Sequence, residues 1–171
     1  FQTTFRGVES LQFDQAAGDA FVSKLSDTGA LTYSTLLGGS ARDAVHALAL
    51  DSTGNAYVSG ITSSANFPVT AGVVQSTYRG AGTPAGLFFR GDVFVAKLNP
   101  AGSGLVFATY LGGTSDEVAT AIAIEPNGNI VVVGFTLSSN FPLSADALQT
   151  TFGGGGGQDY FQMGDAFLSR L

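Results

Sequence analysis

The sequence repeats itself at a spacing of 73 or 74 residues, and no other feature constrains its fold as strongly. The octapeptide GDAFVSKL at Gly18 returns as GDVFVAKL at Gly91 and as GDAFLSRL at Gly164. Tandem repeats of this kind are typical of proteins in which each copy forms one supersecondary unit that packs on the next. The 171 residues therefore hold about two and a third copies of one unit.

The similarity between the copies extends over nearly the whole chain. The matching blocks are Leu31–Gly39 with Leu105–Gly113, Ala47–Thr62 with Ala121–Thr136, and Asn66–Tyr78 with Asn140–Phe152. Phe1–Gly7 repeats the end of the last block, so residues 2–25 and 149–171 are the same part of the unit.

The composition favours short strands joined by tight turns. Gly accounts for 24 of the 171 residues, which is about twice its usual share, and charged residues are only 12%, roughly half of theirs. A hydrophobic content of 44% argues against a disordered chain. Seven scattered Lys and Arg in a chain of net charge −6 make nucleic acid an unsuitable partner. The longest strongly apolar run, Ile130–Val133, is too short to cross a bilayer.

One complete unit contains four predicted strands in succession, joined by turns. They are Val45–Asp51, Ala56–Thr62, Gly91–Leu98 and Leu105–Leu111, and the loop Asp51–Asn55 reads as a hairpin in which Gly54 adopts a positive φ. The first strand is nearly all apolar, so we expect both of its faces to be buried. Four antiparallel strands with an apolar first strand are typical of a β-propeller blade; a β-solenoid or a sandwich is the alternative.

The blocks DAFVSKL, LTYSTLLGGS, ALALDSTGNAYVSGITSS and NFP resemble the SBBP repeat, a β-propeller repeat of exported or surface proteins. The resemblance covers nearly the whole chain in all copies. It implies a seven-bladed propeller; it does not imply an enzyme, and it brings no catalytic residues to carry over.

The expected fold is all-β, with antiparallel four-stranded propeller-type blades in tandem that form an incomplete or assembled propeller. We expect a partial blade at residues 1–43 (strands three and four), a full blade at 44–117 and a partial blade at 118–171 (strands one to three). This arrangement leaves open strand edges. The chain is then a piece of a longer propeller, a subunit that assembles with its own copies, or an irregular stack that covers its own edges.

A long segment separates strands two and three of each unit, at Ser63–Arg90 and Leu137–Met163. Within it Phe67 and Phe141, in the repeated Asn-Phe-Pro, are expected to pack against the blade. The aromatic residues of its variable half are candidates for a binding surface on one loop face, or they simply cover the blade edges. These candidates are Phe88, Phe89, Tyr160 and Phe161.

Acids after the Gly-Gly turns are weak candidates for a calcium site. Asp43 and Glu117 occupy equivalent positions, and Asp116 precedes Glu117. Their carboxylates suit calcium, but no Asp-rich calcium loop is present, so solvated loop acids or hydrogen bonding at the strand start are favoured. The single histidine, His46, is replaced by Thr120 in the next unit, which indicates a structural or incidental role rather than metal binding or catalysis.

Two charged positions recur in all three copies and are interpreted as structural. The acid is expected to accept backbone hydrogen bonds at a turn, and the cation to pair with an acid of the neighbouring strand. They are Asp19, Asp92 and Asp165, and Lys24, Lys97 and Arg170.

The function predicted from these features is a non-enzymatic structural or interaction module, outside the cell or on its surface, that self-assembles into a ring or fibre or acts in adhesion. Its expected partner is itself or the neighbouring blades of a longer chain, with no nucleic acid, no membrane insertion and no cofactor unless calcium binds. The alternative is a ligand-binding propeller that recognises a glycan or a surface protein through its long loop face. A third class, an enzyme domain, would need active residues from blades that this sequence does not contain.

Overall fold

A computed structural model describes residues 1–7, 18–80, 91–154 and 164–171 of the chain. These residues form strands, turns and loops, and every pair of neighbouring strands is antiparallel. The predicted all-β class and the antiparallel, blade-like sheets are therefore confirmed. Within the described residues, no helix has the length and apolar character needed to span a membrane.

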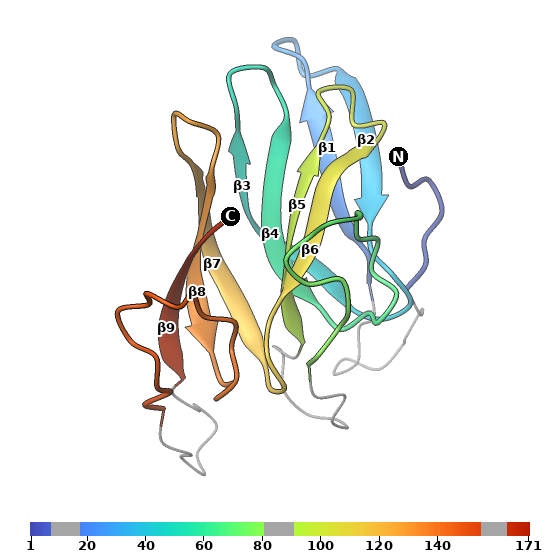
Figure 1. Cartoon of the computed structure of the whole chain (residues 1–171). Helices are drawn as coiled ribbons and strands as arrows, with labels where there is room; N and C mark the ends of the chain where they lie inside the picture. The colour runs from blue at the N-terminus through green and yellow to red at the C-terminus, as the bar shows by residue number, and fades with distance from the viewer. Residues whose placement is uncertain (8–17, 81–90, 155–163) are drawn as a thin grey trace.

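Three sheets lie side by side, and each contains strands that follow one another in the sequence (Figure 1). The first sheet has two strands, the second four and the third three, in the orders β1-β2, β3-β4-β5-β6 and β7-β8-β9. The strands are β1 (Ala20–Leu25), β2 (Leu31–Leu37), β3 (Asp43–Leu50), β4 (Ala56–Thr62), β5 (Asp92–Leu98), β6 (Leu105–Leu111), β7 (Glu117–Ile124), β8 (Ile130–Thr136) and β9 (Asp165–Arg170).

The predicted hairpin turn between the first two strands of a unit is confirmed. Gly54 has a φ of 85° and donates its N–H to the carbonyl oxygen of Asp51 at 3.0 Å. Its equivalent Gly128 has a φ of 93° and makes the same bond to Glu125 at 2.8 Å. A positive φ is readily adopted by glycine alone, which explains why both loops carry it at the same place.

Burial differs from the sequence expectation at the first strand of the unit. In β3 the burial alternates and Leu50 is 63% exposed, whereas every residue of β4 is buried. The prediction that the apolar first strand is buried on both faces is wrong. The reason is position, because β3 lies at the edge of its sheet while β4 and β5 are central strands with a neighbouring sheet on each face.

Two hydrophobic cores fill the spaces between the sheets. One joins the first sheet to the second, with Phe94 at its centre, and the other joins the second sheet to the third, with Phe167. Phe67 stacks on Phe94 with ring centroids 4.5 Å apart, and Phe141 stacks on Phe167 at 4.6 Å. The prediction that the phenylalanine of Asn-Phe-Pro packs on the blade is therefore confirmed in both units.

Residues that follow Asn-Phe-Pro in the second unit run beside β6 and hydrogen-bond to its outer edge. The N–H of Thr70 donates to the carbonyl oxygen of Ala108 at 3.0 Å, and the N–H of Tyr110 donates to that of Gln75 at 3.1 Å. The fourth strand of this unit is thus held on both sides, by β5 and by the connecting segment.

A β-bulge near the start of β3 requires a glycine on the partner strand. The pairing of β3 with β4 shifts between Val45 and Ala47, so His46 is the extra residue. A Cβ atom at Gly60 would lie 1.9 Å from the carbonyl oxygen of Ala44. The same bulge and the same close approach recur in the third sheet at Thr120 and Gly134.

Replacement of Gly60 by alanine is therefore expected to destabilise the fold by roughly 1–3 kcal/mol, the usual cost of forcing atoms into a packed site. Thermal or chemical unfolding of Gly60→Ala measures it. Gly18→Ala is the matched control, because no atom lies within 4 Å of its Cβ position and its φ is ordinary. Equal stability of the two variants would contradict the role assigned to the bulge.

Candidate functional site

The four aromatic residues predicted to form a loop-face binding surface lie outside the described residues. Phe88 and Phe89 fall in 81–90, and Tyr160 and Phe161 fall in 155–163. The ligand-binding alternative therefore stays a prediction.

The acids considered for calcium sit at strand starts and are held by hydrogen bonds. Asp43 and Glu117 are buried, and their carboxylates accept the N–H of Gly39 at 2.8 Å and of Gly113 at 3.1 Å. Asp116 accepts the N–H of Gly91 at 3.0 Å. Of the two favoured interpretations, hydrogen bonding at the strand start describes Asp43 and Glu117, and solvation does not. No group of three or more His, Cys, Asp or Glu gathers in the described part of the chain.

His46 reaches from its bulge to the next sheet. Its Nδ1 lies 3.1 Å from the carbonyl oxygen of Ala119, and it lines a shallow apolar hollow with Val118 and Phe135. This placement agrees with the structural role expected for it, as a contact between two neighbouring sheets.

The acid at the start of the third strand of each unit accepts hydrogen bonds from the segment that connects strands two and three. The Oδ2 of Asp92 accepts the Nε2 of Gln75 at 2.9 Å and the N–H of Arg79 at 2.8 Å. Asp19 and Asp165 make the corresponding bonds in their own units. The expected acceptor role is confirmed, although the backbone donor belongs to the connecting segment and a recurring glutamine joins it. This glutamine was not predicted from the sequence, although it recurs before Thr or Ser in all three copies.

Carboxylates from adjacent sheets meet across a glycine. A Cβ atom at Gly112 would lie 2.8 Å from the Oδ1 of Asp92 and 2.5 Å from the Oε2 of Glu117, so only glycine leaves room for both. The Oδ1 of Asp92 is buried and has no hydrogen-bond partner. Burial, together with the nearby charge of Glu117, raises the pKa of Asp92 to about 7. A proton on this pair neutralises one of its two negative charges.

The same arrangement occurs between the first and second sheets. A Cβ atom at Gly38 would lie 2.8 Å from both the Oδ1 of Asp19 and the Oδ2 of Asp43. Burial raises the pKa of Asp43, and the charge of Asp19 adds to the effect. Each junction between neighbouring sheets thus contains one pair of crowded acids.

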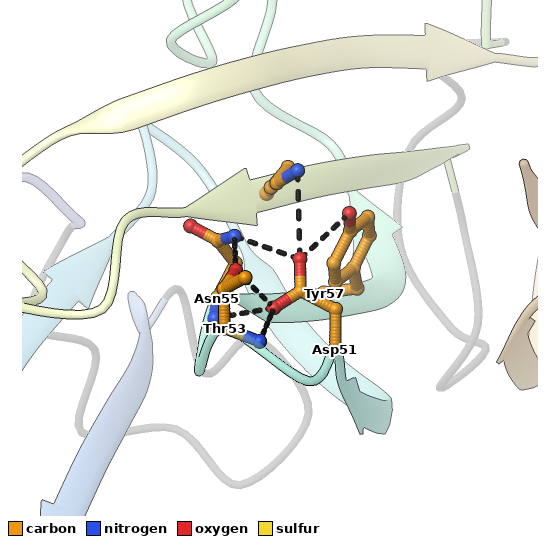
Figure 2. A network of polar contacts seen from close by, with 5 residues as sticks. Asp51, Thr53, Asn55 and Tyr57 are labelled. Carbon is orange, nitrogen blue, oxygen red and sulfur yellow. Dashed lines mark hydrogen bonds and ion pairs between the residues drawn. The ribbon is translucent and has the colours of Figure 1, made fainter. Parts of the chain in front are cut away.

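A polar network surrounds Asp51 at the opposite end of the second sheet (Figure 2). Its Oδ1 accepts the N–H and the hydroxyl of Thr53 and the N–H of Asn55, and its Oδ2 accepts the Asn55 amide and the Tyr57 hydroxyl, at 2.7–3.2 Å. Lys97 adds an ion pair at 3.6 Å. The bond from the Asn55 amide, with those from Thr53, holds the pKa of Asp51 well below its usual range. Because both oxygens accept hydrogen bonds from the loop and from Tyr57, this carboxylate supports the hairpin.

The predicted pairing of the recurring cation with an acid is confirmed in the second and third units, but the acid lies in the hairpin loop and not on the neighbouring strand. Arg170 and Glu125 repeat the pairing in the third unit at 2.6 Å. The ion pair is therefore shared by these two units.

The outer side of the first sheet exposes large apolar side chains, and we call this surface the first end face. It consists of Phe21, Leu25 and Leu31, and Phe21 is 68% exposed. By the 73-residue repeat, Phe21 and Leu25 correspond to Phe94 and Leu98, which are fully buried against the first sheet.

The outer side of the third sheet exposes the opposite surface of the unit, and we call it the second end face. It contains Ala166 and Leu168 of β9, with Leu168 69% exposed, and the half-buried Val131 and Val133 of β8. The equivalents of Ala166 and Leu168 are Val93 and Val95, which are fully buried in the core against the third sheet. The two end faces therefore carry the two halves of an interface that the molecule already contains twice.

Comparison with known families matches residues 32–68 to the model described as "Beta-propeller repeat", SBBP. The chain contains an SBBP beta-propeller repeat. The matched residues run from β2 through β3 and β4 to the Asn-Phe-Pro turn, so the SBBP repeat spans the junction between the first and second sheets. The resemblance stated from the sequence is confirmed for these residues, and its extension to the rest of the chain and the number of blades in a closed ring stay predictions. No curated protein matches the chain significantly.

The Asp92–Glu117 pair predicts a pH dependence of stability. A carboxyl whose pKa is raised by folding adds stability below the unfolded pKa, near 4, and that stability is lost as the pH rises through about 7. The other ionisable groups that interact with Asp92 or with this pair are Tyr78, Tyr110 and Asp116.

In Asp92→Asn the acceptor for Gln75 and Arg79 remains, and the new amide can donate to Glu117. The variant's stability relative to the original chain is expected to rise between pH 4 and 7, by at most about 1.4 kcal/mol per pH unit. Denaturant unfolding at a series of pH values measures it. A difference that does not change with pH would contradict the raised pKa.

Loss of the Asp51 carboxylate is expected to lower the melting temperature at neutral pH, because it leaves the Tyr57 hydroxyl, the Asn55 amide and Lys97 without their acceptor. Asp51→Ala tests this by calorimetry. Ser52→Ala, at the exposed neighbouring position of the same turn, is the control. The folded pKa is lowered, so the effect should fade on acidification as the carboxylate of the original chain becomes protonated.

Proposed function

We propose that this chain is a non-enzymatic structural or interaction module of the cell surface or extracellular space, whose two end faces dock onto further blades. The observation that carries the proposal is the equivalence between exposed and buried positions. Phe21 and Leu168 are exposed, whereas Phe94 and Val95, at the same places in the second unit, are fully buried.

The apolar area on the end faces supports docking energetically. Full burial of one large apolar side chain contributes about 1.5–3 kcal/mol, and the first end face alone presents three such side chains, Phe21, Leu25 and Leu31. Exposed apolar patches on a sheet are also a liability for solubility, which favours their being covered.

The occupant that fits is another blade of the same repeat, here supplied by a second copy of the chain. The first end face of one copy would meet the second end face of the next, as the second sheet meets the first inside the molecule. Such head-to-tail contacts are heterologous, so they close into a ring or continue as a filament, depending on the rotation between copies. The absence of cysteine and the low charge are compatible with a location outside the cell.

A pair of variants tests this function. In Phe21→Arg the first end face is disrupted, and in Leu168→Arg the second end face is disrupted. Light scattering after size exclusion should show assemblies for the original chain and monomers for either variant. Val106→Arg, at an exposed β6 position outside both end faces, should assemble as the original chain does.

A mixture of the two variants gives the sharpest outcome. Each copy then retains one intact end face, and the two intact faces are complementary, so the mixture should form dimers and nothing larger. A monomeric original chain at all concentrations, or assemblies that survive both substitutions, would overturn the proposed function.

A further inference from the structure

Among the described residues the third sheet has three strands, whereas the second has four. In the second sheet β6 pairs with β5, and the connecting segment holds the other edge of β6. Among the described residues no strand pairs with the corresponding edge of β9. The connecting segment that precedes β9 is nevertheless in place, because Phe141 stacks on Phe167 and Gln149 bonds to Asp165 at 2.7 Å.

The recurring glutamine shows what that segment binds in the other two units. The N–H of Gln75 donates to the Oγ1 of Thr109 at 3.0 Å, its carbonyl oxygen accepts the N–H of Tyr110 at 3.1 Å, and its Oε1 accepts the N–H of Gly112 at 3.0 Å.

In the first unit, Gln2 makes the same three contacts, to Thr35, Leu36 and Gly38 of the fourth strand and its turn. The pattern Thr-x-x-Gly of the fourth strand is therefore recognised in the same way twice.

In the third unit, the segment around Gln149 meets no fourth strand within the described residues. Gln149 keeps its side-chain bonds to Thr151 and Asp165, but its N–H, carbonyl oxygen and Oε1 make no hydrogen bond in the described part of the chain. Gln149 is exposed, whereas Gln2 and Gln75 are buried. The segment around Gln149 is thus bonded to Asp165 on one side. On its other side, where the fourth strand lies in the other two units, its hydrogen-bonding groups have no partner among the described residues.

We infer that the edge of β9 and the segment around Gln149 form an acceptor site for an extended peptide with the sequence of the repeat's fourth strand, LVFATYLGG. The peptide adds to the sheet as a fourth strand, with its threonine and its first glycine bonded to Gln149. Recognition by strand addition takes affinity from backbone hydrogen bonds and specificity from a few side chains.

A tyrosine in the peptide provides a second point of recognition. In the second unit the hydroxyl of Tyr110 donates to the carbonyl oxygen of Ser64 at 2.7 Å and accepts the N–H of Phe67 at 3.0 Å. Ser138 and Phe141 are the equivalent residues in the third unit. The peptide tyrosine therefore bonds to these two backbone groups beside the aromatic pair of Phe141 and Phe167.

This inference deepens the proposed function, since it names a partner for one open edge, but it concerns the edge of β9 and not the end faces. Its test uses Phe21→Arg, in which face docking is disrupted and the third sheet is unchanged. A fluorescently labelled peptide of residues 105–113 is titrated with this protein and its anisotropy is measured.

The expected result is saturable binding of LVFATYLGG and none of a scrambled peptide. Replacing the peptide threonine by valine removes the bonds of its hydroxyl to Gln149, keeps the backbone bonds, and should weaken binding roughly tenfold. Hydrogen exchange should show new protection in β9 and not in β1. The unpaired edge of β1 is the side on which the second strand of a unit lies, and not the fourth. On the protein, Gln149→Ala should weaken binding, and the exposed neighbour Thr150→Ala should not.

Absence of binding, equal binding of the scrambled or valine peptide, or protection at β1 would overturn the inference. These outcomes are separate from the test of the proposed function. Peptide binding by a chain whose original form stays monomeric would uphold the acceptor site and reject face docking. Assembly of the original chain, with no peptide binding to Phe21→Arg, would uphold face docking and reject the acceptor site.

Discussion

Face-to-face packing of twisted sheets is the interaction on which the rest of this structure depends. Each sheet is apolar on both sides and packs against at least one neighbour, and the second sheet has a neighbour on each face. Phe94 is buried between the first and second sheets, and Phe167 is buried between the second and third. The Asn-Phe-Pro phenylalanine stacks on each of these rings and ties the connecting segment to the same core. Without the contact between sheets, no single sheet of two to four strands has a core of its own.

Polar groups at the junctions restrict how the sheets can pack. Gly38 and Gly112 let two carboxylates approach from adjacent sheets. Burial raises the pKa of Asp43 and of Asp92, which places a pH-sensitive contact between neighbouring blades. At the other end of the sheets, both carboxylate oxygens of Asp51 accept hydrogen bonds from the hairpin loop and Tyr57 and stabilise the hairpin. The same unit thus combines a pH-sensitive junction between sheets with a hairpin turn stabilised by hydrogen bonds.

Much of this arrangement could be predicted from local pattern. The strands, the Gly54 turn, the packing of Phe67 and the pairing of the recurring cation with an acid all follow from residues that are close in the sequence or recur with the repeat. Burial of β3, the crowding of Asp92 against Glu117 and the hydrogen bonding of the segment around Gln149 could not be predicted in this way. They depend on which strand lies at an edge and which side chains meet across sheets, and neither is encoded in the pattern of one strand.

The repeat alone established an all-β chain of propeller-type units, because a spacing of 73 or 74 residues with the same turns and the same apolar positions admits one supersecondary unit in several copies. The repeat could not establish which of several equivalent positions are buried under a neighbouring sheet. Phe21 and Phe94 have the same local sequence and opposite burial, since exposure is a property of the neighbouring sheet and not of the residue. Packing between sheets therefore determines which of the equivalent apolar positions are buried and which are exposed.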